Sequence, residues 1–365
     1  MFFKFLNEIS MKKSLPALRI ADLTINPPII QGGMGVRVSR ANLAAAVANE
    51  GCVGVIAGVG LGKFENMPSS EYEYVNNEAL KSEIRKAKSM TKGIIGINLM
   101  VALSNYDPLV RTAVDEGVDI IISGAGLPLG LPKFVKKKNI KLIPIVSSAR
   151  ALRIICKKWT KNFNKLPDAV IVEGVRAGGH IGFNFQDVVE EKTPTLDELT
   201  IEVLKFANSF NPKIPVIAAG GIYDGKDIGH YLKLGASGVQ MGTRFVCTDE
   251  CDVHESFKRA YLSAKKEDLV IIKSPVGLPG RVIKNKFVED ILNGKTIPTD
   301  CEYQCLRTCN PATAPYCIAK ALTNTAEGNL QEGFVFAGSN AYRCKEIVPV
   351  KKLIDELVLE AIDYI

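Results

Sequence analysis

Short apolar runs recur along the first two thirds of the chain, and each is followed by a segment long enough to form a helix. Eight such runs are rich in Val and Ile and do not alternate with polar residues: Pro28–Gln31, Val53–Ala57, Ile94–Met100, Asp119–Ser123, Leu142–Ser147, Ala169–Glu173, Val216–Ala219 and Gly238–Gly242. Continuous apolar runs of this kind are typical of parallel strands buried on both faces. The pattern therefore predicts eight parallel β-strands.

The segments between these runs carry helix signals. An Ala-rich stretch begins after Ser39 and ends before Gly51, and Pro108 stands in the first turn of another. Asp224 precedes a third segment that Gly235 closes, and Asp at a helix start and Gly at a helix end are both favoured. Strand–helix alternation repeated eight times predicts an α/β protein with a (β/α)8 TIM barrel. A doubly wound open sheet is the alternative, but it usually has fewer strands and one early glycine-rich turn.

The alternation stops after about residue 245. We predict that residues 16–245 form the barrel and that residues 246–345 form a C-terminal insertion, or lid, over the barrel mouth. Residues 346–365 are expected to form a helix that packs on the barrel, because its apolar residues recur at helical spacing. Residues 1–15 read as an N-terminal extension, within which Met11 is an alternative start.

Composition narrows the class of protein. An apolar fraction of 47% allows a large core, and the net charge of +7 is scattered or sits in short runs such as Lys136–Lys138. Such a surface attracts anionic substrates or cofactors, but without an Arg-rich arm it argues against nucleic acid. No apolar run is long enough to span a bilayer. Nine Cys without a secretory leader predict a cytoplasmic protein with reduced thiols.

Two glycine-rich turns follow the last two predicted strands. Gly220 and Gly221 end one strand, and Gly242 and Thr243 end the next. In (β/α)8 barrels these two loops often bind phosphate, since Gly lets the backbone approach an anion closely and free N–H groups face it. We predict a phosphate site here; the alternative is that these glycines only make tight turns.

Other predicted strands end at the same mouth with small or amide residues. Gly32, Gly33 and Met34 leave room for a flat ring, and Asn98 offers a donor and an acceptor to a heterocycle edge. Ser123 begins another run of small residues after the fourth strand. For Asn98 the alternative role is to satisfy loop backbone groups.

One histidine stands where catalytic groups of this fold reside. His180 follows Gly179 after the sixth strand, and imidazole suits proton transfer near neutral pH. Glu173, at the end of that strand, either holds cofactor hydroxyls or orients the loop. The other two histidines, His230 and His254, lie in helix-like segments and read as surface or packing residues.

Four motifs, in this order, together resemble the nitronate monooxygenase family, formerly the 2-nitropropane dioxygenases. They are Pro28–Gly35 (PIIQGGMG), Glu173–Gly182 (EGVRAGGHIG), Pro215–Ile222 (PVIAAGGI) and Gly238–Phe245 (GVQMGTRF). The resemblance runs from about Pro16 to Ala264 and returns near Gly333–Gly338. The family includes a flavin-dependent enoyl-acyl-carrier-protein reductase and related NADH:quinone reductases.

This resemblance implies an FMN-dependent enzyme with His180 as its active-site histidine. It implies that Gly220, Gly221, Gly242 and Thr243 hold the FMN phosphate. It implies that Glu173 and Gly179 lie close to the isoalloxazine, whose contacts would be Gly32, Gly33, Met34, Asn98 and Gln240. Arg37 departs from the family pattern, because smaller residues are commoner just after the first motif.

The motifs do not distinguish the branches of the family. The first hypothesis is a monooxygenase that oxidises alkyl nitronates with O2. The alternative is an NAD(P)H-dependent reductase of enoyl thioesters or quinones, which would use NAD(P)H as co-substrate. In either case the substrate is a small molecule. For the reductase, the basic surface of the protein would suit an acyl carrier protein as partner. We also consider a homodimer. A third hypothesis is a non-enzymatic barrel that binds a phosphate ligand.

A cysteine-rich segment lies in the predicted insertion. Cys301, Cys305, Cys309 and Cys317 fall within seventeen residues, and on a helix the first three would share one face. Four thiolates hold Zn²⁺ or an iron–sulfur cluster in other proteins. The spacing matches no standard ligand pattern, and the alternative is a set of small buried hydrophobic residues.

Overall fold

The computed structural model describes residues 14–62, 69–135, 139–298, 300–301 and 303–365. In these residues eight parallel strands close into a barrel in the order β10-β11-β3-β4-β5-β6-β7-β8. Their bounds are β3 (Ile29–Gln31), β4 (Val53–Ala57), β5 (Ile94–Met100), β6 (Ile120–Gly124), β7 (Lys141–Val146), β8 (Val170–Glu173), β10 (Val216–Ala219) and β11 (Gly238–Met241). The predicted TIM barrel is confirmed, and the open sheet is excluded. Met11, most of the predicted N-terminal extension and Lys136–Lys138 lie outside the described residues.

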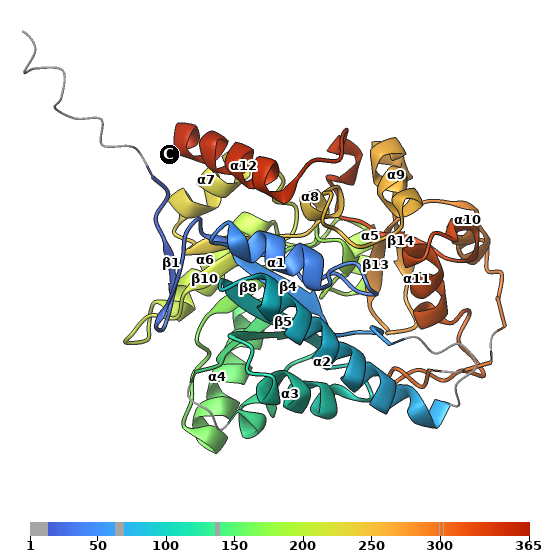
Figure 1. Cartoon of the computed structure of the whole chain (residues 1–365), viewed down its shortest axis with the longest axis horizontal. Helices are drawn as coiled ribbons and strands as arrows, with labels where there is room; N and C mark the ends of the chain where they lie inside the picture. Colours follow the sequence, from blue (N-terminus) through green and yellow to red (C-terminus); the bar gives the residue numbers. More distant parts are fainter. Residues whose placement is uncertain (1–13, 63–68, 136–138, 299, 302) are drawn as a thin grey trace, which may run out of the picture.

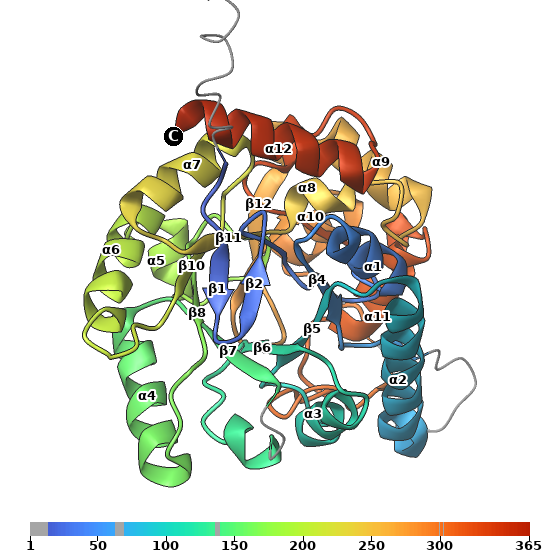
Figure 2. The same cartoon turned by 60° about the vertical axis from the view of Figure 1, so that its left-hand side comes forward.

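A short hairpin covers the N-terminal end of the barrel. Its strands are β1 (Leu18–Ile20) and β2 (Leu23–Ile25), and Figure 2 shows it lying across the centre of the ring of helices. The side chains of Leu18, Ile20 and Ile25 are fully buried and join the Val and Ile side chains that fill the barrel interior. The interior is therefore a packed core, and the space for chemistry lies at the opposite end.

Helices surround the barrel in chain order. They are α1 (Ala41–Asn49), α2 (Tyr72–Met90), α3 (Tyr106–Asp115), α4 (Ala149–Phe163), α5 (Phe185–Val189), α6 (Leu196–Ala207) and α7 (Gly225–Leu234). The signals around α7 act as predicted: Asp224 caps the first turn through the N–H of Asp227, and Gly235 ends the helix with a φ of 107°. The C-terminal α12 (Val350–Tyr364) packs against α7 and α1.

The segment between the last barrel strand and α12 gathers at the end of the barrel away from the hairpin (Figure 1). It contains α8 (Thr243–Val246), α9 (Glu255–Ser263), α10 (Lys286–Leu292) and α11 (Ile318–Ala326), and a small antiparallel sheet of β12 (Leu269–Lys273), β13 (Pro279–Ile283) and β14 (Val335–Phe336). The loop after β8 joins this sheet through β9 (Gly179–His180), which pairs with β13 at Gly280 and Arg281. The insertion is thus fastened to the loop that carries His180.

Candidate active site

A cavity of about 250 Å³ opens at the C-terminal ends of the barrel strands. The register of the barrel sets its floor, because Ala219 lies beside both Glu173 and Gln240, and Asn98 lies beside Ala57. The insertion supplies much of the opposite wall with apolar or aromatic side chains: Tyr303, Leu306, Ile318, Leu322 and Phe336. The cavity is therefore enclosed between the barrel and the insertion.

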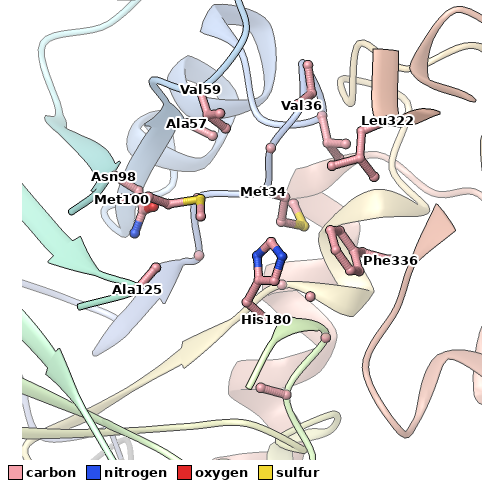
Figure 3. A pocket seen from close by; sticks show the side chains of 18 of the residues that line it. Met34, Val36, Ala57, Val59, Asn98, Met100, Ala125, His180, Leu322 and Phe336 are labelled. Carbon is pink, nitrogen blue, oxygen red and sulfur yellow. The ribbon is translucent and has the colours of Figure 1, made fainter. Parts of the chain in front are cut away.

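The structure brings nearly all of the predicted site residues to this one cavity. Those that line it are Gly32, Gly33, Met34, Asn98, Glu173, Gly179, His180, Gly220, Gly221, Gln240, Gly242 and Thr243. Figure 3 shows the ring of His180 in the middle, with Met34 above it, Phe336 beside it, and Asn98 and Met100 on the far side. Predicted residues from five of the eight barrel strands, or from the loops after them, therefore meet around one space.

Ser123 is the predicted residue that the structure does not bring there. Its side chain is fully buried, and its hydroxyl donates to the carbonyl of Leu99 at 3.0 Å and lies 2.8 Å from the hydroxyl of Tyr106. The next two residues, Gly124 and Ala125, line the cavity instead. Side chains of a strand alternate in direction, so a residue one position away from the mouth faces the packed helix.

The loop after β3 leaves a flat opening in the floor. A Cβ at Gly33 would come 2.4 Å from the Cβ of Asn98, so only glycine fits there. The hydroxyl of Ser39 fixes the loop by accepting from the N–H of Met34 at 2.9 Å. Across the floor, the side-chain oxygen of Gln240 is buried without a hydrogen-bond partner in the described residues. An unpaired buried polar atom is costly, so this oxygen points to a ligand with a hydrogen-bond donor.

The other end of the cavity is lined by a glycine turn and by the hydroxyl-bearing residues Thr243 and Ser339. Gly220 and Gly221 have φ values of 94° and 99°, which glycine adopts readily. The hydroxyl of Ser339 is buried and unpaired within the described part of the chain, and its backbone N–H donates to the carbonyl of Arg176. Asn340 donates to the carbonyl of Gly221 at 2.6 Å and so ties this segment to the glycine turn. The arrangement suits an anionic group.

His180 is held by residues of the insertion. Its Nε2 lies 2.8 Å from the hydroxyl of Ser274, and its ring meets that of Phe336 edge-on with centroids 5.0 Å apart. Burial lowers the pKa of His180 to about 4, because low-polarity surroundings disfavour the imidazolium. The imidazole is therefore neutral at physiological pH and able to accept a proton or to donate one hydrogen bond.

Glu173 has the opposite shift for the same reason. Burial raises the pKa of its carboxyl group to about 7, since the carboxylate loses hydration. Shifted titrating groups that line one cavity are a mark of functional sites. Of the other two histidines, His230 bonds to Asp197 at 2.9 Å and His254 caps α9 through the N–H of Ser256. Both have the surface or packing roles that the sequence indicates.

Arg37 does not line the cavity. Its guanidinium donates to the carbonyls of Gly60 and Gly62 and forms an ion pair with Glu327, at the end of α11. The residue that departs from the family pattern therefore links the loop after β3 to the loop after β4 and to the insertion.

Sequence reasoning missed two residues of the site. Ser274 stands in the turn between β12 and β13, and Ser339 follows Gly338 just after β14. Both are isolated serines in irregular segments, and only the pairing of β9 with β13 brings the first of them to His180. The resemblance near Gly333–Gly338 was the one signal that pointed toward Ser339.

Comparison with known proteins agrees with this geometry. The family model for nitronate monooxygenase matches residues 17–113 and 102–360. The chain belongs to the nitronate monooxygenase family. It is accordingly an oxidoreductase, and the third hypothesis, a non-enzymatic barrel, is set aside.

Individual relatives come from different branches. A Mycobacterium tuberculosis protein named (3aS,4S,5R,7aS)-5-hydroxy-7a-methyl-1-oxo-octahydro-1H-indene-4-carboxyl-CoA dehydrogenase is 27% identical, over 93% of this chain and 94% of its own. A probable nitronate monooxygenase of Staphylococcus saprophyticus is 28% identical, over 73% of this chain and 78% of its own. The structure of FabK from Thermotoga maritima is 31% identical with a TM-score of 0.74, covering 93% of this chain and 94% of that one.

The comparisons and the fold leave the substrate open. Separately, no helix among the described residues has the length and apolar character needed to cross a membrane.

Proposed function

We propose that this protein is an FMN-dependent reductase of α,β-unsaturated acyl thioesters, with NAD(P)H as co-substrate. FMN binding is supported by the fit of the cavity to that cofactor. The unpaired oxygen of Gln240 suits an N–H at the edge of the isoalloxazine, and the space beside Gly33 suits a flat ring. The turn at Gly220 and Gly221, with the hydroxyls of Thr243 and Ser339, suits the phosphate. When bound there, FMN would supply hydride transfer.

The observation that carries the substrate class is a neutral His180 in a cavity closed by apolar side chains of the insertion. An anionic nitronate would meet an uncharged imidazole at His180 and the buried carboxyl group of Glu173, although the cationic Arg176 also lines this cavity. A neutral enoyl group avoids this cost, and its acyl chain would contact Leu306, Ile318 and Leu322. His180 would hold the thioester carbonyl or deliver a proton next to it.

The comparisons support the same order. The Mycobacterium tuberculosis CoA-thioester dehydrogenase and FabK align over 93% of the chain at 27% and 31% identity. A nitroalkane oxidase of Streptomyces ansochromogenes covers the same share at 22% identity, and the Rhodococcus jostii CoA-thioester dehydrogenase covers 73%. The insertion forms the outer wall of the cavity, and we expect this wall to determine substrate specificity. The share of the chain that is aligned does not rank the two substrate classes, so the proposal leans on the higher identity of FabK over the full length.

Nitronate oxidation is the second candidate, and it stood first on sequence motifs alone. The neutral imidazole of His180 favours it in one respect, since a neutral base can remove a proton from an uncharged nitroalkane. The first proposal carries further expectations. The net charge of +7 motivates an acyl carrier protein as partner, and the free cysteines motivate a cytoplasmic location. A homodimer is also expected.

Anaerobic mixing of the flavin-loaded protein with NADH, NADPH or ethylnitronate separates the two candidates. We expect a reduced pyridine nucleotide to bleach the flavin, and crotonyl-CoA or a longer trans-2-enoyl-CoA to restore its colour without O2. Rapid bleaching by ethylnitronate, with no reaction toward NADH or NADPH, would overturn the reductase proposal in favour of the second candidate. A purified protein that binds riboflavin or FAD but not FMN would overturn the cofactor assignment.

A further inference from the structure

A second, smaller cavity lies within the insertion and is ringed by sulfur. Cys301, Cys305, Cys309 and Cys317 all line this space of about 40 Å³. All four are free thiols, and each of the other three lies near enough to Cys305 to act on its charge. A shared helix face does not form here, because residues 303–316 form turns and irregular backbone. The irregular chain nevertheless brings to one place four cysteines spread over seventeen residues.

The loop that carries these cysteines is held in place from several sides. The N–H of Ser104 donates to the carbonyl of Cys305, and the N–H of Arg307 donates to that of Ala102. These bonds fasten the segment to the loop after β5. The N–H of Ile297 donates to the carbonyl of Pro315 at 2.7 Å and closes the other side. Backbone bonds therefore fix the course of the loop that carries the four thiols.

Backbone donors face two of the sulfur atoms. The N–H of Gln304 lies 3.3 Å from the sulfur of Cys301. Cys317 is the residue before α11, and the N–H groups of Ala319 and Lys320 face its thiol. Hydrogen bonds of this kind stabilise thiolates and tune metal–sulfur centres.

A buried hydroxyl gives a second, independent indication of a ligand. Tyr316 lines the same small cavity and is 2% exposed, yet its hydroxyl has no hydrogen-bond partner in the described residues. Buried tyrosine hydroxyls usually find a partner. A group that fills the cavity and accepts a hydrogen bond would supply one, and inorganic sulfide or a bound thiolate is such an acceptor.

The size of the space favours a cluster over a single ion. In the described residues no group of three or more His, Cys, Asp or Glu side chains is placed to hold a metal ion, so ligation requires these thiols to move toward the bound centre. A tetrahedral Zn²⁺ draws its sulfurs together at about 2.3 Å from the metal, whereas these thiols surround an open space. That space of about 40 Å³ exceeds the roughly 10–15 Å³ that one water molecule needs. A polynuclear centre keeps its ligands farther apart.

We propose that Cys301, Cys305, Cys309 and Cys317 ligate an iron–sulfur cluster. Its site shares a wall with the large cavity, since Cys305, Leu306 and Ile318 line both spaces. The cluster stands one layer of residues from the proposed flavin site and fixes the part of the insertion that closes it.

The test is metal and sulfide analysis of the full-length protein, purified without O2 and also reconstituted with ferrous iron and sulfide. We expect on the order of four iron and four acid-labile sulfide per chain, as in a [4Fe–4S] cluster, and an electron paramagnetic resonance signal after dithionite reduction. Cys309→Ser should lose most of the iron and sulfide. Cys156→Ser, which changes a buried cysteine of α4 far along the chain, should retain both.

Flavin content and the fluorescence of Trp159, the single tryptophan, report on folding in the same samples. Iron and sulfide in the wild type no higher than in Cys309→Ser, after reconstitution, would overturn the proposal. One zinc per chain without sulfide would overturn it as well. Either result leaves the flavin assignment untouched, because flavin content is measured separately.

Discussion

His180 and Ser274 are 94 positions apart in the chain, yet Nε2 of the histidine lies 2.8 Å from the hydroxyl of the serine. The histidine comes from the loop after β8, and the serine comes from the turn between β12 and β13. Antiparallel pairing of β9 with β13 holds the two segments in register. The barrel supplies the imidazole, and the insertion sets its direction.

Replacing Ser274 with Ala should therefore lower kcat without emptying the flavin site. One lost hydrogen bond is worth about 1 kcal/mol, which corresponds to a fall in kcat of roughly fivefold. The KM for the pyridine nucleotide should not change, since Ser274 contacts the histidine. Steady-state kinetics and flavin content per chain measure both. Ser274→Thr keeps the hydroxyl and should restore most of kcat; equal loss in both variants would contradict a positioning role.

Removal of the imidazole should have a larger effect. His180→Ala is expected to keep its flavin and to lose turnover by about 10²- to 10⁴-fold, the usual contribution of a positioned acid or base. His230→Ala is the matched control, because His230 bonds to Asp197 on the outer helices. Turnover with the enoyl thioester, measured beside flavin absorbance, gives the comparison. Full activity in His180→Ala would remove this residue from the reaction.

Glu173 should make stability depend on pH in a definite direction. Its folded-state pKa of about 7 lies above the ordinary value of 4.5. The folded protein therefore binds this proton more tightly, and the free energy of unfolding falls as pH rises through this range. Glu173→Gln removes the dependence, so the variant should gain stability relative to wild type at about pH 8, on the order of 1–3 kcal/mol, and little at about pH 4.

Urea unfolding followed through Trp159 measures this difference in the flavin-free protein. The variant must be compared with wild type at each pH, because His180 changes the free energy of unfolding with pH in the opposite direction. Its lowered pKa makes stability rise with pH between about 4 and 6.5. The same gain at both pH values would show that Glu173 does not titrate in this range.

Whether a site residue can be predicted from the sequence depends on whether local or long-range structure places it. The barrel was predictable because its strands are local apolar runs, and the ends of parallel strands meet at one mouth whatever the loops do. Gly33, Asn98 and His180 follow from that rule. Ser123 does not, because one position along a strand reverses the direction of the side chain. Its hydroxyl points to Tyr106.

Long-range pairing accounts for what was missed. Ser274 reaches His180, and Ser339 reaches the cavity, only because irregular segments of the insertion fold back on the loop after β8. No local period marks such segments. The four cysteines were visible as a group, but their spacing did not reveal the irregular loop that carries them, since tertiary bonds to the loop after β5 shape the chain there.

Gly33 should be intolerant of any side chain. The Cβ of Gly33→Ala would lie 2.4 Å from the Cβ of Asn98, and both atoms are close to the backbone, so the floor of the cavity must shift. We expect flavin content to fall at least tenfold, which corresponds to about 1.4 kcal/mol of binding free energy. Gly130→Ala is the control, because its nearest neighbour is the flexible end of Lys133 at 3.8 Å. Titration of the flavin-free proteins with FMN measures both; equal affinities would contradict the steric argument.

Arg37 and Glu327 form an ion pair, but the two residues should not matter equally. The side chain of Glu327 is 44% exposed and that of Arg37 is 9% exposed. Glu327→Gln should cost less than about 1 kcal/mol, as is usual for an exposed pair. Arg37→Met also leaves the carbonyls of Gly60 and Gly62 without their donor, and each unsatisfied carbonyl costs about 1–3 kcal/mol. Urea unfolding should show the second change to be several times the first. Similar losses would mean that Arg37 acts mainly through the insertion, and not by fixing the loop after β4.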